Sequence, residues 1–222
     1  MHDADRSETY LPLLRELAAL RDLPEAPARY LAGGSALRTL TRGQVLCEKG
    51  NAGAGFFCLL SGRVKLSAVA ADGSERVLEL VLPGRVFGQA AAVLDEPFPF
   101  LAQALVETQV LQVSRERIRK AIEQWPEVAG SMLRLVSQDC MRLVHDLEAC
   151  CLMSARQRLV DFLIKEARPR VGSHHDATLA LPASKAVVAS SLNLTPETFS
   201  RELHDLARRG LVRVERRTVE IP

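Results

Sequence analysis

Three residues that can make directed hydrogen bonds, Glu197, Ser200 and Arg201, lie within five positions of one another near the carboxyl end of the chain. The carboxylate accepts hydrogen bonds, the hydroxyl donates and accepts them, and the planar guanidinium can donate two parallel bonds to one acceptor edge. Such a set is suited to recognition. No nucleophile, general base or phosphate-binding loop stands at the spacing that catalysis would need, so we do not expect an enzyme.

Residues 192–210, LNLTPETFSRELHDLARRG, predict the helix that positions these side chains. Thr195 is a favourable N-cap, Pro196 suits the first helical position, and Gly210 can end the helix. The apolar residues recur at i, i+4 and i+7 and must face a core: Phe199, Leu203 and Leu206. The three hydrogen-bonding residues fall off this stripe and stay free to contact a partner.

The preceding residues predict a second, shorter helix over 184–191, SKAVVASS. Val187, Val188 and Leu192 would point inward, and the small Ala189 would lie where two helices cross. Asn193 tolerates the left-handed conformation that a tight turn between the helices needs. The pair is typical of a helix-turn-helix with a recognition helix, although an αα-hairpin that serves only packing has the same pattern.

The composition is that of an ordinary globular chain of 222 residues, 47% hydrophobic and 25% charged, enough for two modest domains. The polar, acidic amino terminus shows no signal-peptide pattern, and no apolar run reaches the roughly 18 residues that span a bilayer. We expect a cytoplasmic protein without a membrane partner. Five cysteines without a repeated spacing fit a reducing compartment, with small buried roles for most of them.

The net charge of +2 is unevenly distributed along the chain. Residues 154–222 carry 12 Lys and Arg against 8 Asp and Glu, a net charge of +4, whereas residues 1–153 carry 17 against 19, a net charge of −2. The basic excess lies in the half that contains the helix pair. This asymmetry is typical of a polyanion-binding module joined to a neutral one.

The first half of the chain predicts a β-rich domain. Between residues 37 and 113, short β-forming runs alternate with turn signals at intervals of 11 to 12 residues, as in an antiparallel barrel or roll. Asp72-Gly73 predicts a hairpin turn. Residues 10–32 predict one or two short helices, broken at Pro24 and Pro27.

Residues 126–153 predict one long helix with a coiled-coil seam. Its apolar residues alternate in steps of four and three, and Pro126 is tolerated in the first turn. The seam consists of Ala129, Leu133, Val136, Cys140, Leu143, Leu147 and Cys150. Such a seam needs a second helix, although a helix buried inside one chain has the same spacing.

The glycine spacing within FFCLLSGRVKL and ADGSERVLELVLPGRVFG, followed by a helix pair, closely resembles the cyclic-nucleotide-binding fold of the CRP/FNR superfamily of transcription regulators. The pattern Glu-x-x-Ser-Arg at residues 197–201 is most similar to the FNR-type and Dnr-type recognition helix. The resemblance implies an α+β fold with an antiparallel β-roll and a winged helix-turn-helix. It implies a sensor domain over 1–125, a dimerisation helix over 126–153 and a DNA-binding domain over 154–222.

The remaining elements of the implied DNA-binding domain are also visible in the sequence. Residues 154–167 predict its first helix, with Ser154 as the cap. The run TLAL predicts a short strand, and the alternating residues after Gly210 predict a hairpin wing that turns at Arg216 and Arg217.

The resemblance implies a homodimer that binds a palindromic double-stranded DNA operator and contacts RNA polymerase. Arg201 can pair with guanine O6 and N7, Glu197 can accept from a cytosine amino group, and Ser200 can contact thymine. By the FNR-type match, the operator is close to TTGAT, four spacer base pairs and ATCAA. Phosphate contacts would orient the helix, from Ser184, Lys185, Thr195, Thr198, Arg216 and Arg217. The alternative from another class is a ligand-binding signalling module whose helix pair contacts a protein.

The implied effector pocket differs from that of the cyclic-AMP-binding relatives. Their Glu for the ribose hydroxyl is replaced here by Gln89, and Pro99 and Phe100 stand where Arg and Ser bind the phosphate. A buried phosphate would therefore lack a partner. The predicted pocket residues are Phe87, Gly88, Gln89, Pro99, Phe100, Leu143 and Val144. This pattern favours an apolar pocket and disfavours cyclic AMP, although a cyclic-nucleotide-responsive regulator stays an alternative.

Other cofactors are constrained by the cysteines and histidines. An iron–sulfur cluster is disfavoured, because no cysteine precedes Cys47 and the five show no cluster spacing. The Dnr-type resemblance implies a haem that responds to nitric oxide. Its axial ligand would come from His2, His145, His174, His175 or His204. The run His174-His175-Asp176 could contribute to a metal site, but the sequence places no further ligand next to it. We therefore expect no separate metal site.

Overall fold

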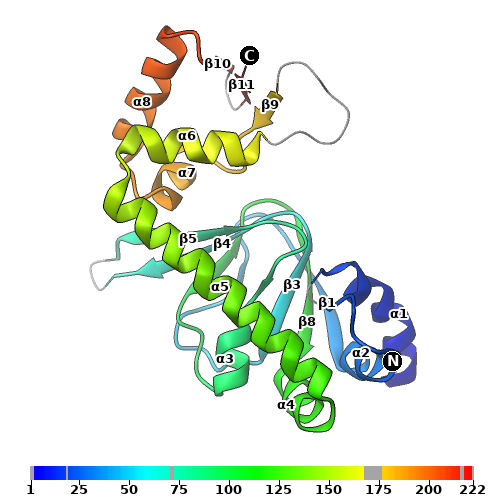
Figure 1. Ribbon diagram of the computed structural model, residues 1–222. Coiled ribbons are helices and arrows are strands. Elements are labelled where there is room, and N and C mark those ends of the chain that lie inside the picture. Colours follow the sequence, from blue (N-terminus) through cyan, green and yellow to red (C-terminus); the bar gives the residue numbers. More distant parts are fainter. Residues whose placement is uncertain (1–2, 19, 71–72, 168–176, 216–217, 222) are drawn as a thin grey trace. The chain divides into compact units, whose positions relative to one another are not determined.

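The computed structural model describes residues 3–18, 20–70, 73–167, 177–215 and 218–221. The chain divides into two compact units, an N-terminal unit of residues 1–141 and a C-terminal unit of residues 142–222. The long helix α5 (Pro126–Leu152) contributes to both units (Figure 1). The expected long helix is thus confirmed, and each unit is described below by itself.

Two four-stranded antiparallel sheets form the centre of the described N-terminal unit. The first has the order β1-β8-β3-β6, with β1 (Ser35–Leu40), β8 (Thr108–Ser114), β3 (Gly55–Ser61) and β6 (Val86–Phe87). The second has the order β2-β7-β4-β5, with β2 (Val45–Cys47), β7 (Leu101–Ala104), β4 (Val64–Val69) and β5 (Glu75–Val81). All neighbouring strands pair antiparallel, so the predicted β-roll is confirmed.

Strand β3 shows why the sequence FFCLL forms the middle of this roll. Successive side chains of a strand point to opposite faces. Phe57 and Leu59 enter the apolar cluster between the two sheets, whereas Phe56 and Cys58 pack against the helices. Both faces are therefore buried, which accounts for a continuous apolar run in place of an alternating one.

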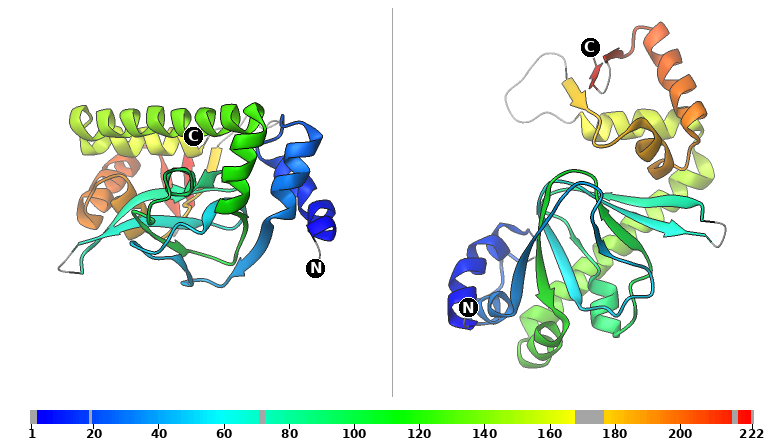
Figure 2. Two further views of the ribbon diagram at one scale, coloured as in Figure 1. Left: turned by 90° about the horizontal axis from the view of Figure 1, so that it is seen from below. Right: turned by 180° about the vertical axis from the view of Figure 1, so that it is seen from behind.

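Helices cover the outer face of the first sheet in the N-terminal unit. They are α1 (Asp3–Glu16), α2 (Glu25–Gly33), α4 (Arg115–Gln124) and the first half of α5, with the short α3 (Gln89–Leu94) nearby. Figure 2 shows α1 and α2 side by side in both views. From α5, Val128, Met132 and Leu135 are buried in this cluster. The inner face of α5 thus belongs to the core of the N-terminal unit.

The predicted helix breaks near the amino terminus are partly wrong. Pro24 does separate two helices, because it is the N-cap of α2. Pro27, however, lies inside the first turn of α2, and α1 contains Pro12. A proline in the first turn removes only an N–H that has no partner within the helix, so Pro27 leaves the helix intact. The sequence patterns did not predict α3 or α4.

The C-terminal unit combines three further helices with a small antiparallel sheet of order β10-β11-β9. Its elements are α6 (Ala155–Glu166), β9 (Ala177–Ala180), α7 (Lys185–Ser191), α8 (Pro196–Arg208), β10 (Arg213–Glu215) and β11 (Thr218–Ile221). The expected winged helix-turn-helix is confirmed. The predicted turn residues Arg216 and Arg217 lie outside the described residues.

Helix α6 begins with a capping box. The Ser154 hydroxyl accepts a hydrogen bond from the Gln157 backbone N–H at 3.3 Å, and the Gln157 side chain accepts one from the Ser154 N–H at 2.8 Å. Two otherwise unpaired backbone groups are satisfied in this way. Buried Leu159 and Leu163 then direct α6 toward α8.

The expectation that most cysteines have small buried roles is wrong. Cys47 and Cys58 are buried, and burial raises the pKa of both thiols, that of Cys47 to about 11. Cys140, Cys150 and Cys151 are exposed on α5. Cys140 and Cys150 belong to the predicted seam, which the chain itself leaves largely uncovered.

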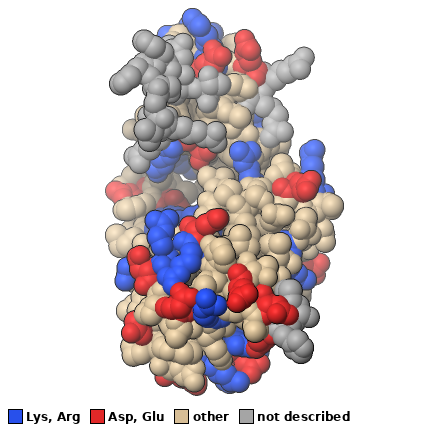
Figure 3. Space-filling view, turned by 90° about the vertical axis from the view of Figure 1, so that its right-hand side faces the viewer, with Lys and Arg blue, Asp and Glu red and all other residues tan. Residues whose placement is uncertain are grey.

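Charges of both signs are interspersed on the molecular surface. On the face shown in Figure 3, Lys and Arg side chains form small groups among Asp and Glu side chains. A polyanion-binding surface must therefore be argued from named residues. Within the part of the chain that the structure describes, no helix has the length and apolarity needed to cross a bilayer.

The turn between α7 and α8 generates the first testable prediction. Asn193 has φ +53°, in the left-handed region, and its side-chain Nδ2 lies 4.0 Å from Cys150 Sγ. Asn193→Ala should lower the free energy of unfolding by about 1 kcal/mol, because an L residue with a Cβ resists this region, whereas Asn193→Gly should be nearly neutral. Urea denaturation followed by circular dichroism measures both. Equal stability of the Ala and Gly variants would contradict this account.

Candidate nucleic-acid interface and effector site

Side-chain caps define the starts of both helices of the pair. The Ser184 hydroxyl accepts from the Val187 N–H at 3.4 Å, which caps α7. The Thr195 hydroxyl accepts from the Thr198 N–H at 3.2 Å, and Pro196 occupies the first turn of α8. The cap predicted at Thr195 is confirmed. The direction of α8 is fixed from its first residue.

Helix α8 has one buried face and one exposed face. Phe199, Leu203 and Leu206 are buried, as the apolar spacing predicted. The opposite face presents the three predicted recognition residues, all exposed: Glu197, Ser200 and Arg201. The structure thus places these three side chains together on the solvent side of the first two turns, while their role in binding stays a prediction.

Glu197 is held in its charged form at the start of α8. Hydrogen bonds from its own backbone N–H and then from the Thr195 hydroxyl lower the pKa of its carboxyl. The unpaired N–H groups of a helix start favour a negative charge in the same way. Glu197 is therefore a hydrogen-bond acceptor at neutral pH.

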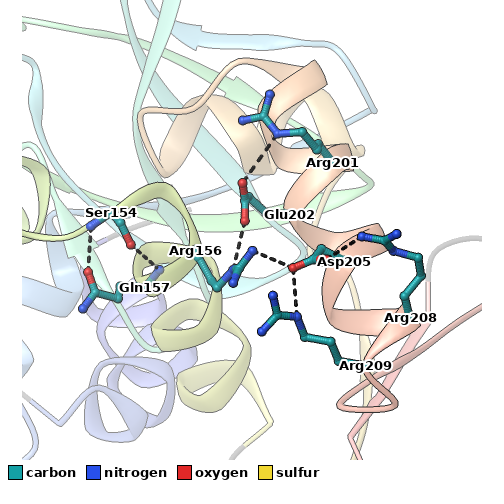
Figure 4. Close-up of polar contacts among 8 residues, drawn as sticks. All are labelled: Ser154, Arg156, Gln157, Arg201, Glu202, Asp205, Arg208 and Arg209. Carbon is teal, nitrogen blue, oxygen red and sulfur yellow. Dashed lines mark hydrogen bonds and ion pairs between the residues drawn. The ribbon is translucent and has the colours of Figure 1, made fainter.

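A network of ion pairs attaches α8 to α6 (Figure 4). Arg156 of α6 donates from Nε to Glu202 at 3.1 Å and from Nη2 to Asp205 at 2.5 Å. Asp205 also pairs with Arg208 at 2.7 Å and with Arg209 at 3.1 Å. The sequence patterns missed Arg156, Glu202 and Asp205. Charged residues at i, i+3 and i+4 beside the apolar stripe could have indicated them.

The residues predicted to contact phosphate have different environments. Ser184 and Thr195 are exposed, whereas Lys185 and Thr198 are half-buried. The hydroxyl oxygens of Thr195 and Thr198 lie 3.2 Å apart. Arg216 and Arg217 lie outside the described residues.

The predicted seam of α5 is an apolar stripe that the chain itself leaves largely uncovered. Leu133, Leu143 and Leu147 are 69%, 58% and 64% exposed, respectively. Of the other seam residues, Val136, Cys140 and Cys150 are exposed and Ala129 is half-buried. A stripe of large apolar side chains in water is unfavourable unless a partner covers it.

Aromatic rings occupy the predicted effector site in the N-terminal unit. Phe87 is buried and Phe100 half-buried, and their ring centroids lie 6.5 Å apart. Pro99 is exposed, and the neighbouring Phe98 is buried instead, 5.8 Å from Phe100. Phe98 belongs to this aromatic cluster, and the sequence patterns did not identify it. The predicted pocket residues Leu143 and Val144 are exposed on the C-terminal part of α5.

Gly88 connects this aromatic cluster to α3. Its φ is +82°, and a Cβ there would lie 3.0 Å from Cε1 of Phe98, so this position favours glycine. The next residue, Gln89, is buried. Its Nε2 donates to Oδ2 of Asp139, while its Oε1 has no hydrogen-bond partner among the described residues.

Asp139 is the second site residue that the sequence patterns missed. Its Oδ1 accepts from Arg85 Nη2 at 3.1 Å, and the same Arg85 nitrogen lies 3.4 Å from Glu79. Asp139 thus joins Gln89 of α3 to Arg85, within a group of polar side chains beside the aromatic cluster. An Asp four residues after the buried Leu135 continues the inner stripe of α5, a signal that could have identified it.

Comparisons with known proteins agree with this arrangement. Residues 37–124 match the family profile of a cyclic nucleotide-binding domain, and residues 157–222 match that of a Crp-like helix-turn-helix domain. The Cyclic AMP receptor protein of Thermus thermophilus is 28% identical over 83% of this chain and 82% of its own. Transcriptional activator protein anr of Pseudomonas aeruginosa is 28% identical over 83% of this chain and 75% of its own.

The structure of FixK2 from Bradyrhizobium japonicum has the same fold, with a TM-score of 0.75 at 22% identity over 84% of this chain and 92% of that chain. The chain belongs to the CRP/FNR family of transcription regulators. The C-terminal unit of this CRP/FNR regulator is its DNA-binding helix-turn-helix, and the N-terminal unit contains its cyclic-nucleotide-binding-like domain. Equal identity to a cyclic AMP receptor and to anr does not select a branch, so the effector must be argued from site residues.

The described part of the N-terminal unit offers no histidine to the haem that the Dnr-type resemblance implies. Between residues 3 and 141 the sequence has no histidine, so the aromatic cluster has no imidazole ligand of its own. His145 and His204 are exposed, and His2, His174 and His175 lie outside the described residues. Among the residues described, no three His, Cys, Asp or Glu side chains are grouped as metal ligands.

The ion pairs of Asp205 predict how stability depends on pH. The Arg208 hydrogen bond, followed by the charges of Arg209 and Arg156, lowers the pKa of the Asp205 carboxyl below its ordinary value of 3.8. A lowered pKa stabilises the fold above the ordinary value, and this contribution is lost as the pH falls through the folded-state pKa. Thermal unfolding should give wild type a higher melting temperature than Asp205→Asn at neutral pH. The difference between the two melting temperatures should shrink in acid. A difference independent of pH would show that the charge is not responsible.

Proposed function

We propose that this CRP/FNR regulator is a homodimer that reads an FNR-like palindrome, TTGAT, four spacer base pairs and ATCAA, under the control of an effector other than cyclic AMP. The single observation that carries the proposal is the exposed set of Glu197, Ser200 and Arg201 on the capped start of α8. The buried face attaches α8 to the rest of the C-terminal unit. The exposed face can therefore enter the major groove, where these three side chains would contact base edges.

The chemistry of the three residues suits a G·C-containing half-site. Arg201 donates two hydrogen bonds to guanine O6 and N7, and ionised Glu197 accepts from the cytosine amino group of the same core. Ser200 contacts a thymine edge. Exposed Ser184 and Thr195, with Lys185 and Thr198, supply phosphate contacts that orient α8 without reading sequence.

A two-fold dimer through α5 supports the palindrome. Parallel pairing of the seam would cover the exposed Leu133, Leu143 and Leu147, and it repeats the recognition helix in a second copy. Two recognition helices related by a twofold axis require two inverted half-sites about one DNA turn apart.

The effector site favours a ligand without a phosphate. Phe87, Phe98 and Phe100 form an aromatic cluster at the predicted site, and Pro99 and Phe100 stand where the cyclic-AMP-binding relatives place the phosphate-binding Arg and Ser. Burying a phosphate against such a site would cost several kcal/mol. A haem-linked response stays a prediction of the Dnr-type resemblance, and no step of the proposed function depends on it.

Base reading is tested by competition between the palindrome and a form with each half-site G·C pair replaced. The replacement should cost wild type about 1 to 3 kcal/mol per half-site, and Arg201→Ala should already have lost that discrimination. As a matched control, Arg217→Ala should weaken both DNAs alike if it contacts a phosphate. If Arg201→Ala discriminates as well as wild type, the base-reading role of α8 is wrong. A wild type that binds neither DNA would favour a protein-binding signalling module.

The dimer is tested at the centre of the seam. Leu143→Asp places two like charges opposite each other in a parallel pair, which should give monomers and an operator affinity reduced at least tenfold, or by about 1.4 kcal/mol. Static light scattering measures the mass of both proteins. An unchanged dimer for Leu143→Asp would remove the seam assignment.

Cyclic AMP is tested by isothermal titration calorimetry on the purified protein. Because Pro99 and Phe100 stand where Arg and Ser bind the phosphate in the cyclic-AMP-binding relatives, we expect no saturable heat at micromolar concentrations of nucleotide and no change in operator affinity. Saturable micromolar binding would favour the cyclic-nucleotide-responsive alternative, which the names of the Thermus thermophilus relative and of the matching domain suggest.

A further inference from the structure

Glu202 lies between the proposed reading residue Arg201 and the anchor Arg156. Its Oε1 is 3.6 Å from Nε of Arg201, and its Oε2 accepts a hydrogen bond from Nε of Arg156 at 3.1 Å (Figure 4). The Glu202 side chain is 14% exposed, whereas that of Arg201 is 69% exposed. A largely buried carboxylate thus joins an exposed guanidinium to helix α6.

The ion pair uses one particular edge of the Arg201 guanidinium. Glu202 faces Nε, and Figure 4 shows the two terminal nitrogens directed away from the carboxylate. The terminal nitrogens stay free to donate two parallel hydrogen bonds to one guanine. A long arginine side chain loses rotamer freedom on binding, and a restraint that already exists in the free protein reduces that cost.

We propose that Glu202 is a positioning residue that sets the specificity of Arg201. Its carboxylate restrains the Nε side of the Arg201 guanidinium. The two terminal nitrogens are thereby oriented toward the guanine edge in the major groove. This inference rests on the proposed function, because it requires that Arg201 reads the G·C pair.

A purely structural role of Glu202 is disfavoured by the neighbouring contacts. Asp205 makes its own ion pairs with Arg156, Arg208 and Arg209, so the attachment of α8 to α6 does not depend on Glu202 alone. The distance of 3.6 Å from Arg201 is that of an ion pair without a direct hydrogen bond. The effect of Glu202 should therefore be modest and confined to discrimination.

The test measures the ratio of affinities for the palindrome and its G·C-substituted form in four proteins: wild type, Glu202→Gln, Arg201→Ala and the double variant. Glu202→Gln should reduce the wild-type ratio by about two- to fivefold, the range expected for one exposed ion pair. In the Arg201→Ala background the same substitution should leave the ratio unchanged, because Glu202 acts through Arg201.

The matched control is Asp161→Asn, which removes another carboxylate and its ion pair with Lys165 from the same unit, without contact to Arg201. It should keep the wild-type ratio. Circular dichroism checks the folding of every variant, and if Glu202→Gln fails to fold, Glu202→Asp, which withdraws the carboxylate from Arg201, should show the same loss.

Two results would overturn the inference while leaving the proposed function intact. One is that Glu202→Gln has the same ratio of affinities for the two DNAs as wild type. The other is an equal loss of affinity for the palindrome when Glu202→Gln is added to the wild-type and to the Arg201→Ala protein, as a structural role predicts. A wild type that does not discriminate the two DNAs would instead overturn the proposed function, and the role of Glu202 with it.

Discussion

The burial of one face of α8 determines where its other face points. Phe199, Leu203 and Leu206 are fixed in the core of the C-terminal unit, so Arg201 can only face solvent. The Thr195 cap sets the start of the helix, and the ion pairs of Arg156 with Glu202 and Asp205 attach its side to α6. The proposed recognition would therefore depend on packing and capping as well as on Glu197, Ser200 and Arg201 themselves.

Helix α5 carries two stripes with different tasks. The inner stripe of Val128, Met132 and Leu135 is buried in the N-terminal unit, and Asp139 continues it to the hydrogen bond with Gln89. The outer stripe is the exposed seam. Because both stripes share one rigid helix, a ligand that altered the contacts of Asp139 would act directly on the element that carries the proposed dimer interface.

Much of the architecture could be predicted from local patterns. Turn signals, apolar periodicity and caps at Ser154 and Thr195 are properties of short segments, and the structure confirms them. What failed depends on contacts between distant segments. Asp139 and Gln89 are 50 positions apart, and no local pattern joins them. Pro27 was misjudged because its effect depends on its position in the helical turn, and the exposed cysteines because periodicity does not say which stripe of α5 is covered.

The central claim is that the chain reads a defined palindrome through α8. The most direct measurement is selection of bound sequences by the purified wild-type protein from a pool of random double-stranded DNA, followed by sequencing. The account predicts enrichment of inverted TTGAT and ATCAA half-sites separated by four base pairs, with the G·C pair the most strongly selected position of each half-site. Binding without enrichment of any sequence, or enrichment of single unpaired half-sites, would contradict it.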